Sequence, residues 1–294
     1  MGTSPSGYIT ARVAEVTRLS PSFIRVVFDN PEPEQFVSSG VPDEIVHLYF
    51  PADGESAPPS MEFNGETLGH HRPEDVRECR NYTVRRWDRD TITIDFVDHG
   101  GGVACSWARS ATPGQYLGMW GTRSWYRPPG DTDWMLLAAD LPGIPAMLRV
   151  IEQLPPGQRA LAIAEVAHAD DVLTVNSVAD VTVEWCIGGN DRAESQLAQR
   201  VTSHPVPDGP GYVWFAGEAS VGRAVRKHFR KDSPVPPNRL AIVGYWRADK
   251  QEWLDRYRDK SEQLMTEFER IDNSSIGDAE AELYWDEILE REGL

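Results

Sequence analysis

The hydrophobic pattern of the chain changes once, at residues 127–130 (Arg-Pro-Pro-Gly), and this change is the strongest constraint on the fold. Before it, short runs of β-branched and aromatic residues alternate with turn residues, as expected for an antiparallel sheet. After it, the continuous apolar run 134–139 is followed by segments that read in turn as helix and strand, as expected for a parallel sheet. The sequence therefore predicts two domains that meet near residue 129.

The first domain, residues 1–129, is predicted to be an antiparallel β-barrel. Strands are expected at 8–19, 23–29, 45–50, 82–87 and 91–97. The stretch 52–78 is rich in proline, glycine and charge, so a long surface loop is expected there.

The second domain, residues 130–248, is predicted to be an α/β domain with a parallel sheet of the nucleotide-binding type. Its strands are expected at 134–139, 160–166, 181–187, 212–216 and 240–243, and its helices at 144–154, 193–201 and 219–229. Residues 249–294 are predicted to form an acidic helical extension. Apolar residues recur at helical spacing from Trp253 to Phe268, which favours a helix packed on the body, its acidic face in solvent, over a tail that binds a partner.

Charge and cysteine content limit the partners and the compartment. The net charge of −17 opposes binding to nucleic acid or to an anionic membrane, and residues 249–294 alone hold fifteen acidic and six basic residues. No apolar stretch is long enough to span a membrane, and the N-terminus lacks the pattern of a secretory signal. Three scattered cysteines without a CxxC pair indicate a reducing compartment, the cytoplasm. His70, His71 and Cys79 lack paired ligand spacing, so no metal site is expected.

The strand 80–85 (Arg-Asn-Tyr-Thr-Val-Arg) carries the residue types that a flavin requires. Arg80 and Tyr82 share one face of the strand, and Thr83 and Arg85 share the other. An aromatic wall, a hydroxyl for the flavin N5 atom and cations for a pyrophosphate are all present. Taken alone, the segment is also explained as an edge strand with surface arginines.

A glycine run follows, from His99 to Gly102, directly before a predicted helix. Glycines let the backbone approach an anion closely, and the first free N–H groups of the helix, at Val103, Ala104 and Cys105, then point at that anion. A pyrophosphate is the natural ligand for such a turn.

Together these segments resemble the siderophore-interacting proteins, which are FAD-dependent ferric-siderophore reductases of the ferredoxin reductase superfamily. The family's R-x-Y-T-x-R strand is matched at 80–85. Its H-G-x-x-G-P-A-x-x-W-A signature appears at 99–108, one residue short and with Val103 in place of the usual proline. The segment 214–219 (Trp-Phe-Ala-Gly-Glu-Ala) and the Y-W-R element at 245–247 also match.

The resemblance implies a fold in which the barrel binds FAD and the parallel-sheet domain binds NADPH or NADH as electron donor. It implies that Tyr82 packs against the flavin ring and Thr83 lies near N5, as the residues next to the chemistry. The implied cofactor-binding residues are Arg80, Tyr82, Thr83, Arg85, His99, Gly102, Val103, Ala104, Cys105, Asp140 and Glu218. Asp140 lies in a turn, 139–143, that departs from the family's G-D-E-T-A run, which leaves the choice between NADH and NADPH open.

The resemblance also implies basic residues around the flavin that bind the iron chelate, and His47, Arg247 and Lys250 are the candidates. A strand histidine without such a role is an equally good explanation of His47. Arg223 and Arg226 are either contacts of a 2′-phosphate or solvated helix residues. The implied reaction is transfer of electrons from NAD(P)H to ferric iron in a siderophore. The alternatives are a flavoreductase supplied with electrons by ferredoxin and a non-catalytic flavin- or siderophore-binding protein.

Overall fold

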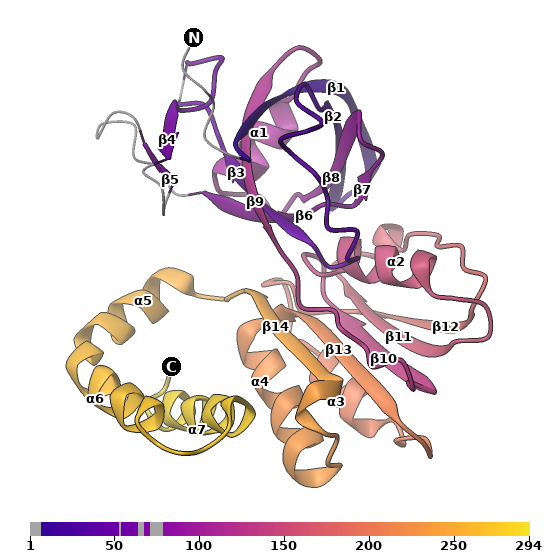
Figure 1. The fold of residues 1–294 in the computed structure, drawn as a ribbon, viewed down its shortest axis with the longest axis vertical. Helices are drawn as coiled ribbons and strands as arrows, with labels where there is room; N and C mark the ends of the chain where they lie inside the picture. The colour runs from indigo at the N-terminus through magenta and orange to yellow at the C-terminus, as the bar shows by residue number, and fades with distance from the viewer. Residues whose placement is uncertain (1–6, 53, 64–67, 71–78) are drawn as a thin grey trace.

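The computed structural model describes residues 7–52, 54–63, 68–70 and 79–294. It contains an antiparallel barrel, a parallel sheet flanked by helices, and a helical C-terminal extension (Figure 1). The predicted fold class is therefore confirmed. His71 and most of the charged part of 52–78 lie outside the described residues. Among the described residues, no helix has both the length and the apolar character needed to cross a membrane.

The barrel is a seven-stranded sheet with the order β6-β3-β9-β1-β2-β8-β7. Its strands are β1 (Ile9–Ser20), β2 (Phe23–Asp29), β3 (Ile45–Tyr49), β6 (Arg80–Thr83), β7 (Arg86–Trp87), β8 (Thr91–Val97) and β9 (Tyr116–Arg123). The backbone N–H of Arg85 donates to the carbonyl oxygen of Thr93 at 2.9 Å, so the chain just beyond β6 joins β8 and closes the sheet. Helix α1 (Val103–Ser110) covers one end, where Trp107 stacks on Phe28 with ring centroids 6.1 Å apart.

Two features of the barrel region differ from the prediction. Strand β9 was not expected, because Gly118 and Gly121 weaken the strand pattern. Gly118 is required by packing: a Cβ atom there would lie 2.1 Å from the hydroxyl oxygen of Tyr8. Within 52–78, β4 (Met61–Phe63) pairs with β5 (Leu68–His70), so the prediction of one long loop is wrong. Strands of three residues are too short to show alternation in the sequence.

The parallel sheet has the order β12-β11-β10-β13-β14. Its strands are β10 (Trp134–Ala139), β11 (Arg159–Val166), β12 (Asp180–Ile187), β13 (Gly211–Glu218) and β14 (Leu240–Trp246). Helix α2 (Ile144–Gln153) covers the face that carries Met135 and Leu137. Helices α3 (Leu197–Ser203) and α4 (Ala219–Lys227) cover the opposite face. The alternation along β10 therefore supplies two cores, one on each side of the sheet.

The extension consists of α5 (Lys250–Asp259), α6 (Ser261–Asp272) and α7 (Asp278–Arg291), coloured yellow in Figure 1. Leu264, Ile288 and Leu289 form a small core of its own, against which Trp253 and Tyr257 pack. On α7, Glu287 and Glu290 are exposed, as expected for an acidic face in solvent, but Asp286 is largely covered, and all three form ion pairs with basic residues of α4 and of the turn that follows it.

Buried polar contacts join the barrel to the parallel sheet. Asp171, in the turn after β11, accepts hydrogen bonds from the Ser20 hydroxyl at 2.7 Å and from the Ser22 hydroxyl at 2.8 Å. Arg149 of α2 donates to the carbonyl oxygen of Val84 at 2.5 Å and lies 3.7 Å from Glu44. These contacts fix the seam along which the candidate site lies.

Candidate functional site

Helix α1 begins in a conformation that leaves its first amides available. Gly102 precedes the helix with φ 85°, a left-handed value that favours glycine, and no side chain caps the helix start. A Cβ atom at Gly100 or Gly101 would meet no atom within 4 Å, so the space over the turn is open. The predicted residues His99, Gly102 and the first turn of α1 thus form an open end with a partial positive charge.

Tyr82 of β6 packs on the part of the barrel core that contains residues of α1. Its ring lies on the barrel core, 4.5 Å from the Phe96 ring centroid. Burial is the main cause that raises the pKa of Tyr82; Cys105 raises it further, whereas Arg80 lowers it. The core cluster on which Tyr82 packs also contains Ala104 of the first turn of α1, and the Phe96 ring lies 5.5 Å from the Trp107 ring of the same helix, centroid to centroid. Tyr82 and its strand neighbour Arg80 therefore lie at the corner of the barrel that α1 covers.

A carboxylate holds α1 in this position. Asp98, at the end of β8, accepts a hydrogen bond from the Cys105 thiol at 3.2 Å and pairs with Arg109 at 2.6 Å. Partial burial opposes ionisation, but the hydrogen bonds from Arg109, Cys105 and Arg18 outweigh it and hold the pKa of Asp98 below its usual value. Asp98 therefore stays charged and holds α1 in place through Cys105 and Arg109.

Thr83 lies on the seam and faces the other domain. Its hydroxyl oxygen is buried and makes no well-formed hydrogen bond among the described residues. The Tyr245 hydroxyl, at the carboxyl end of β14, donates to the carbonyl oxygen of Asp43 in the barrel at 3.5 Å. Tyr245 also packs on Trp125, with ring centroids 6.4 Å apart. The hydroxyl of Thr83 is thus an unsatisfied polar group between the barrel and the parallel sheet.

Arg85 lies apart from the corner formed by Arg80 and Tyr82. Its guanidinium pairs with Glu152 of α2 at 2.5 Å and approaches Asp95 at 3.8 Å. Two carboxylates therefore neutralise it, and it links the two domains. The assignment of Arg85 to a phosphate stays a prediction, and the structure gives this side chain other partners.

Asp140 and Glu218 lie together at the carboxyl edge of the parallel sheet. Asp140 Oδ2 accepts hydrogen bonds from the Glu218 backbone N–H at 2.8 Å and from the Trp246 indole at 2.7 Å, and its Oδ1 is buried without a hydrogen-bond donor in the part of the chain that the structure describes. Burial raises the pKa of Asp140 to about 7, although both hydrogen bonds lower it. Glu218 caps α4 through the amides of Ser220 and Val221. Ligands of open α/β sheets bind at this edge.

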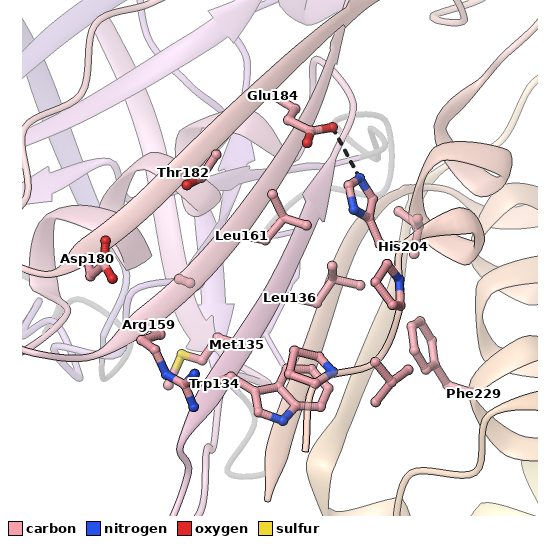
Figure 2. A pocket seen from close by; sticks show the side chains of 15 residues that line it. Trp134, Met135, Leu136, Arg159, Leu161, Asp180, Thr182, Glu184, His204 and Phe229 are labelled. Atoms are coloured by element: carbon pink, nitrogen blue, oxygen red, sulfur yellow. Dashed lines mark hydrogen bonds and ion pairs between the residues drawn. The ribbon is translucent and has the colours of Figure 1, made fainter. Parts of the chain in front are cut away.

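A separate pocket of about 330 Å³ lies at the opposite, amino edge of the sheet (Figure 2). The starts of three neighbouring strands line it, at Trp134, Arg159 and Asp180. The imidazole of His204 pairs with Glu184 at 3.1 Å across its rim. Its position at the amino ends of the strands separates it from the seam.

Comparisons with known proteins agree with this arrangement. The family model described as Siderophore-interacting FAD-binding domain matches residues 12–125, and that described as Siderophore-interacting protein matches residues 132–249. An NADPH-dependent ferric-chelate reductase of Escherichia coli is 30% identical over 245 residues, which cover 80% of this chain and 91% of that protein. This chain belongs to the siderophore-interacting protein family.

Further relatives support the membership. An uncharacterized protein of Mycobacterium bovis is 31% identical over 263 residues, which cover 83% of this chain and 92% of that protein. The crystal structure of a siderophore utilization protein from T. fusca matches with a TM-score of 0.71 at 28% identity and covers 82% of this chain and 93% of that one.

The residues at the barrel corner fit the FAD of this family. The open helix end and Arg80 suit a diphosphate, and Tyr82 offers an aromatic surface. The unsatisfied Thr83 hydroxyl needs a hydrogen-bond partner, and a flavin ring in the seam supplies one. The fit rests on these features of the chain itself.

The basic residues expected at the iron chelate of a siderophore-interacting protein lie on two parts of the molecule. On β3, His47 Nδ1 lies 2.6 Å from the Asn81 side-chain oxygen. Beyond β14, the Arg247 guanidinium lies 4.3 Å from the centre of the Trp253 ring, and burial lowers the pKa of Arg247. Lys250 is exposed at the start of α5. Their contact with the chelate stays a prediction.

Several residues that build the seam were not expected from the sequence. Trp214 donates to buried Asp43 at 3.2 Å, and Trp246 donates to Asp140. Arg149 is the one charged residue within an otherwise apolar helical turn, and this pattern indicates a buried partner. The partners themselves, Glu44 and Asp43, lie about a hundred residues or more away in the chain.

Proposed function

We propose that this protein is an FAD-dependent reductase that passes electrons from NADPH to ferric iron in a siderophore and releases the iron as Fe(II). One observation carries the proposal: the Tyr245 hydroxyl, at the carboxyl edge of the parallel sheet, donates to the Asp43 carbonyl oxygen of the barrel at 3.5 Å, so this edge adjoins the domain that holds the flavin corner. A dinucleotide bound at that edge approaches the flavin position from the second domain. The names of relatives support the donor and the acceptor, because the Escherichia coli protein is an NADPH-dependent ferric-chelate reductase.

In this proposal each residue of the barrel corner has a defined task. Arg80 and the amides of Val103, Ala104 and Cys105 balance the charge of the diphosphate, and His99 and Gly102 shape the turn. Tyr82 packs against the flavin ring, and the Thr83 hydroxyl forms a hydrogen bond at N5. Asp140 and Glu218 border the place of the nicotinamide nucleotide.

The reaction needs positioning more than proton transfer. FAD held at the barrel corner would supply the redox chemistry, since a flavin can take up an electron pair as hydride and give electrons up singly. One NADPH therefore reduces two ferric chelates and leaves NADP⁺, one proton and two ferrous ions, which hard oxygen ligands hold less tightly. The contribution of the chain is to hold donor and acceptor at the two sides of one seam, with His47, Arg247 and Lys250 as contacts of an anionic chelate.

The proposed domain limits are 1–129 for the FAD domain, 130–248 for the nucleotide domain and 249–294 for the extension. The spans of the two family models support the first two. The proposed compartment is the cytoplasm, where three free cysteines remain reduced.

The first test concerns the cofactor. Purified protein is expected to show flavin absorption, and Arg80→Ala is expected to weaken FAD binding roughly ten- to hundredfold, the value of one charge-assisted hydrogen bond. Arg86→Ala, which removes an exposed arginine from β7, is the matched control and should leave FAD binding unchanged. If Arg80→Ala and Tyr82→Ala both fold and keep full FAD affinity, the proposed site is wrong.

The second test concerns the electron donor. NADPH oxidation is followed together with the appearance of Fe(II), trapped by a ferrous chelator, in the presence of a ferric siderophore. Reduction by ferredoxin but by neither NADPH nor NADH would favour the ferredoxin-fed alternative. Siderophore binding without Fe(II), even with chemically reduced flavin, would favour a non-catalytic binding protein.

A further inference from the structure

Helix α7 has two chemically different faces. Its apolar residues Ile288 and Leu289 point into the small core of the extension, together with Leu264 of α6. Its carboxylates Asp286 and Glu290 meet cations of α4. The extension is therefore held together by apolar packing, whereas α7 meets the nucleotide domain through charge.

The ion pairs beneath α7 follow α4 and the turn after it. Arg226 pairs with Asp286, and Lys231 pairs with Glu287. Lys227 pairs with Glu290 at 3.2 Å, and these two side chains are 53% and 65% exposed. Pairs this exposed contribute little each and are screened by salt. Water or another anion can therefore replace the exposed carboxylates of Glu287 and Glu290 at low cost in free energy.

A pocket of about 470 Å³ lies between α3, α4 and α7. Arg223, Lys227, His228 and Lys231 line one side of it, and α7 supplies Glu287 and other carboxylates on the opposite side. This volume lies within the usual range for a small-molecule site.

One guanidinium nitrogen of Arg223, which lines this pocket, has no hydrogen-bond acceptor among the described residues. Arg223 Nη1 is buried and donates no hydrogen bond in the described structure. A buried donor without an acceptor is unfavourable, and a guanidinium matches the oxygen atoms of a phosphate especially well. The pocket therefore combines unsatisfied positive charge with carboxylates that other anions can displace.

We propose that this pocket binds a phosphate group and that α7 is its built-in competitor. The carboxylates of Glu287 and Glu290 occupy the positions of phosphate oxygens at Lys231 and Lys227. A phosphate that enters pairs with Arg223 and with these lysines, and the carboxylates of α7 return to solvent. The phosphate comes either from the 2′-position of the dinucleotide or from free inorganic phosphate. The proposal goes beyond the reductase function and requires no ferric reduction.

The test measures binding by calorimetry in FAD-saturated protein, so that the diphosphate site at α1 is already filled. The probes are adenosine 2′,5′-bisphosphate, AMP and inorganic phosphate. The double variant E287Q/E290Q removes the competitor charges and keeps the side-chain shapes. It is expected to bind a phosphate probe about five- to tenfold more tightly than the natural chain, the combined value of two exposed ion pairs. The gain should shrink as sodium chloride is added.

The control variant E262Q/E280Q makes the same change in net charge at exposed positions of α6 and α7. Equal tightening in this control would show a general charge effect and overturn the proposal. Adding Arg223→Gln to E287Q/E290Q should abolish the gain; if it does not, the phosphate binds elsewhere and the proposal is wrong. A gain for the bisphosphate but not for AMP or phosphate identifies the 2′-phosphate, and a gain for inorganic phosphate identifies the free ion.

Discussion

The parallel sheet contacts its two neighbours in opposite ways. Toward the barrel, Arg149 and Glu44 are 5% and 0% exposed, and Asp171 is fully buried among serine donors. Toward the extension, Arg226 and Asp286 are 18% and 16% exposed, but Lys227 and Glu290 remain more than half exposed. Both contacts use charged residues, but only the first removes all of them from water.

This difference assigns different mechanical roles to the two contacts. A buried charge that loses its partner is strongly unfavourable, so each member of the barrel seam is needed by the others. An exposed pair gives up its partner to water at little cost. The seam therefore keeps the two domains in register, whereas the Glu287 and Glu290 carboxylates of α7 can separate from their lysines without disturbing that register.

The largest effect is expected from Arg149→Met. It leaves Glu44 buried without a counter-charge and removes the hydrogen bond to Val84, so the free energy of unfolding should fall by about 3–5 kcal/mol. Urea unfolding measures the change. Arg159→Met, at an exposed position on β11, is the control and should change it by less than about 0.5 kcal/mol. The double variant R149M/E44Q should recover a large part of the loss; if R149M itself costs as little as R159M, the seam is not a buried one.

Asp171→Ala is expected to cost about 3 kcal/mol, because the hydroxyls of Ser20 and Ser22 and two backbone N–H groups lose their acceptor. Asp170→Ala, one residue earlier and exposed, is the control. Thermal unfolding of the two variants measures the difference. A similar loss for both variants would contradict the anchoring role of Asp171.

Local patterns in the sequence were sufficient for the fold. The apolar run 134–139 matches β10, and the expected helix at 144–154 differs from α2 by one residue. β9 was not predicted because one of its glycines, Gly118, serves a contact with Tyr8, which is over a hundred residues away in the chain. The break at Lys260 between α5 and α6 was also not predicted, because the helical spacing of apolar residues continues across it.

The site could be predicted only where short motifs carry it. Tyr82 of the strand 80–83 packs on a core cluster that contains Ala104 of α1, some twenty residues away. The partner of Asp140, Trp246, lies two strands away in the sheet, and the barrel contact of Tyr245 lies at Asp43. Such pairings depend on how two folded units pack against each other, and the spacing of residue types along the sequence does not predict that packing.

Asp140→Asn is expected to change the dependence of stability on pH. Because the pKa of Asp140 is raised to about 7 in the folded protein, its contribution to stability is full at low pH and is lost as the pH rises through about 7. The natural chain should therefore lose about 2 kcal/mol between about pH 5.5 and about pH 8 from this group, and Asp140→Asn should not. Urea unfolding at both pH values measures the change, and parallel curves for the two proteins would contradict a buried, unpaired carboxyl.

The smallest effect is expected at α7, and its dependence on salt concentration distinguishes exposed ion pairs from buried ones. E287Q/E290Q removes two exposed ion pairs, so it should lower the free energy of unfolding by less than about 1 kcal/mol at low ionic strength. In about 0.5 M sodium chloride the difference should vanish, since exposed charges are then screened within a few ångströms. The loss caused by Arg149→Met should persist in the same salt, because its ion pair is buried. If the α7 variant lost several kcal/mol, or if salt left its effect unchanged, the two contacts would be alike and α7 would be a fixed part of the domain.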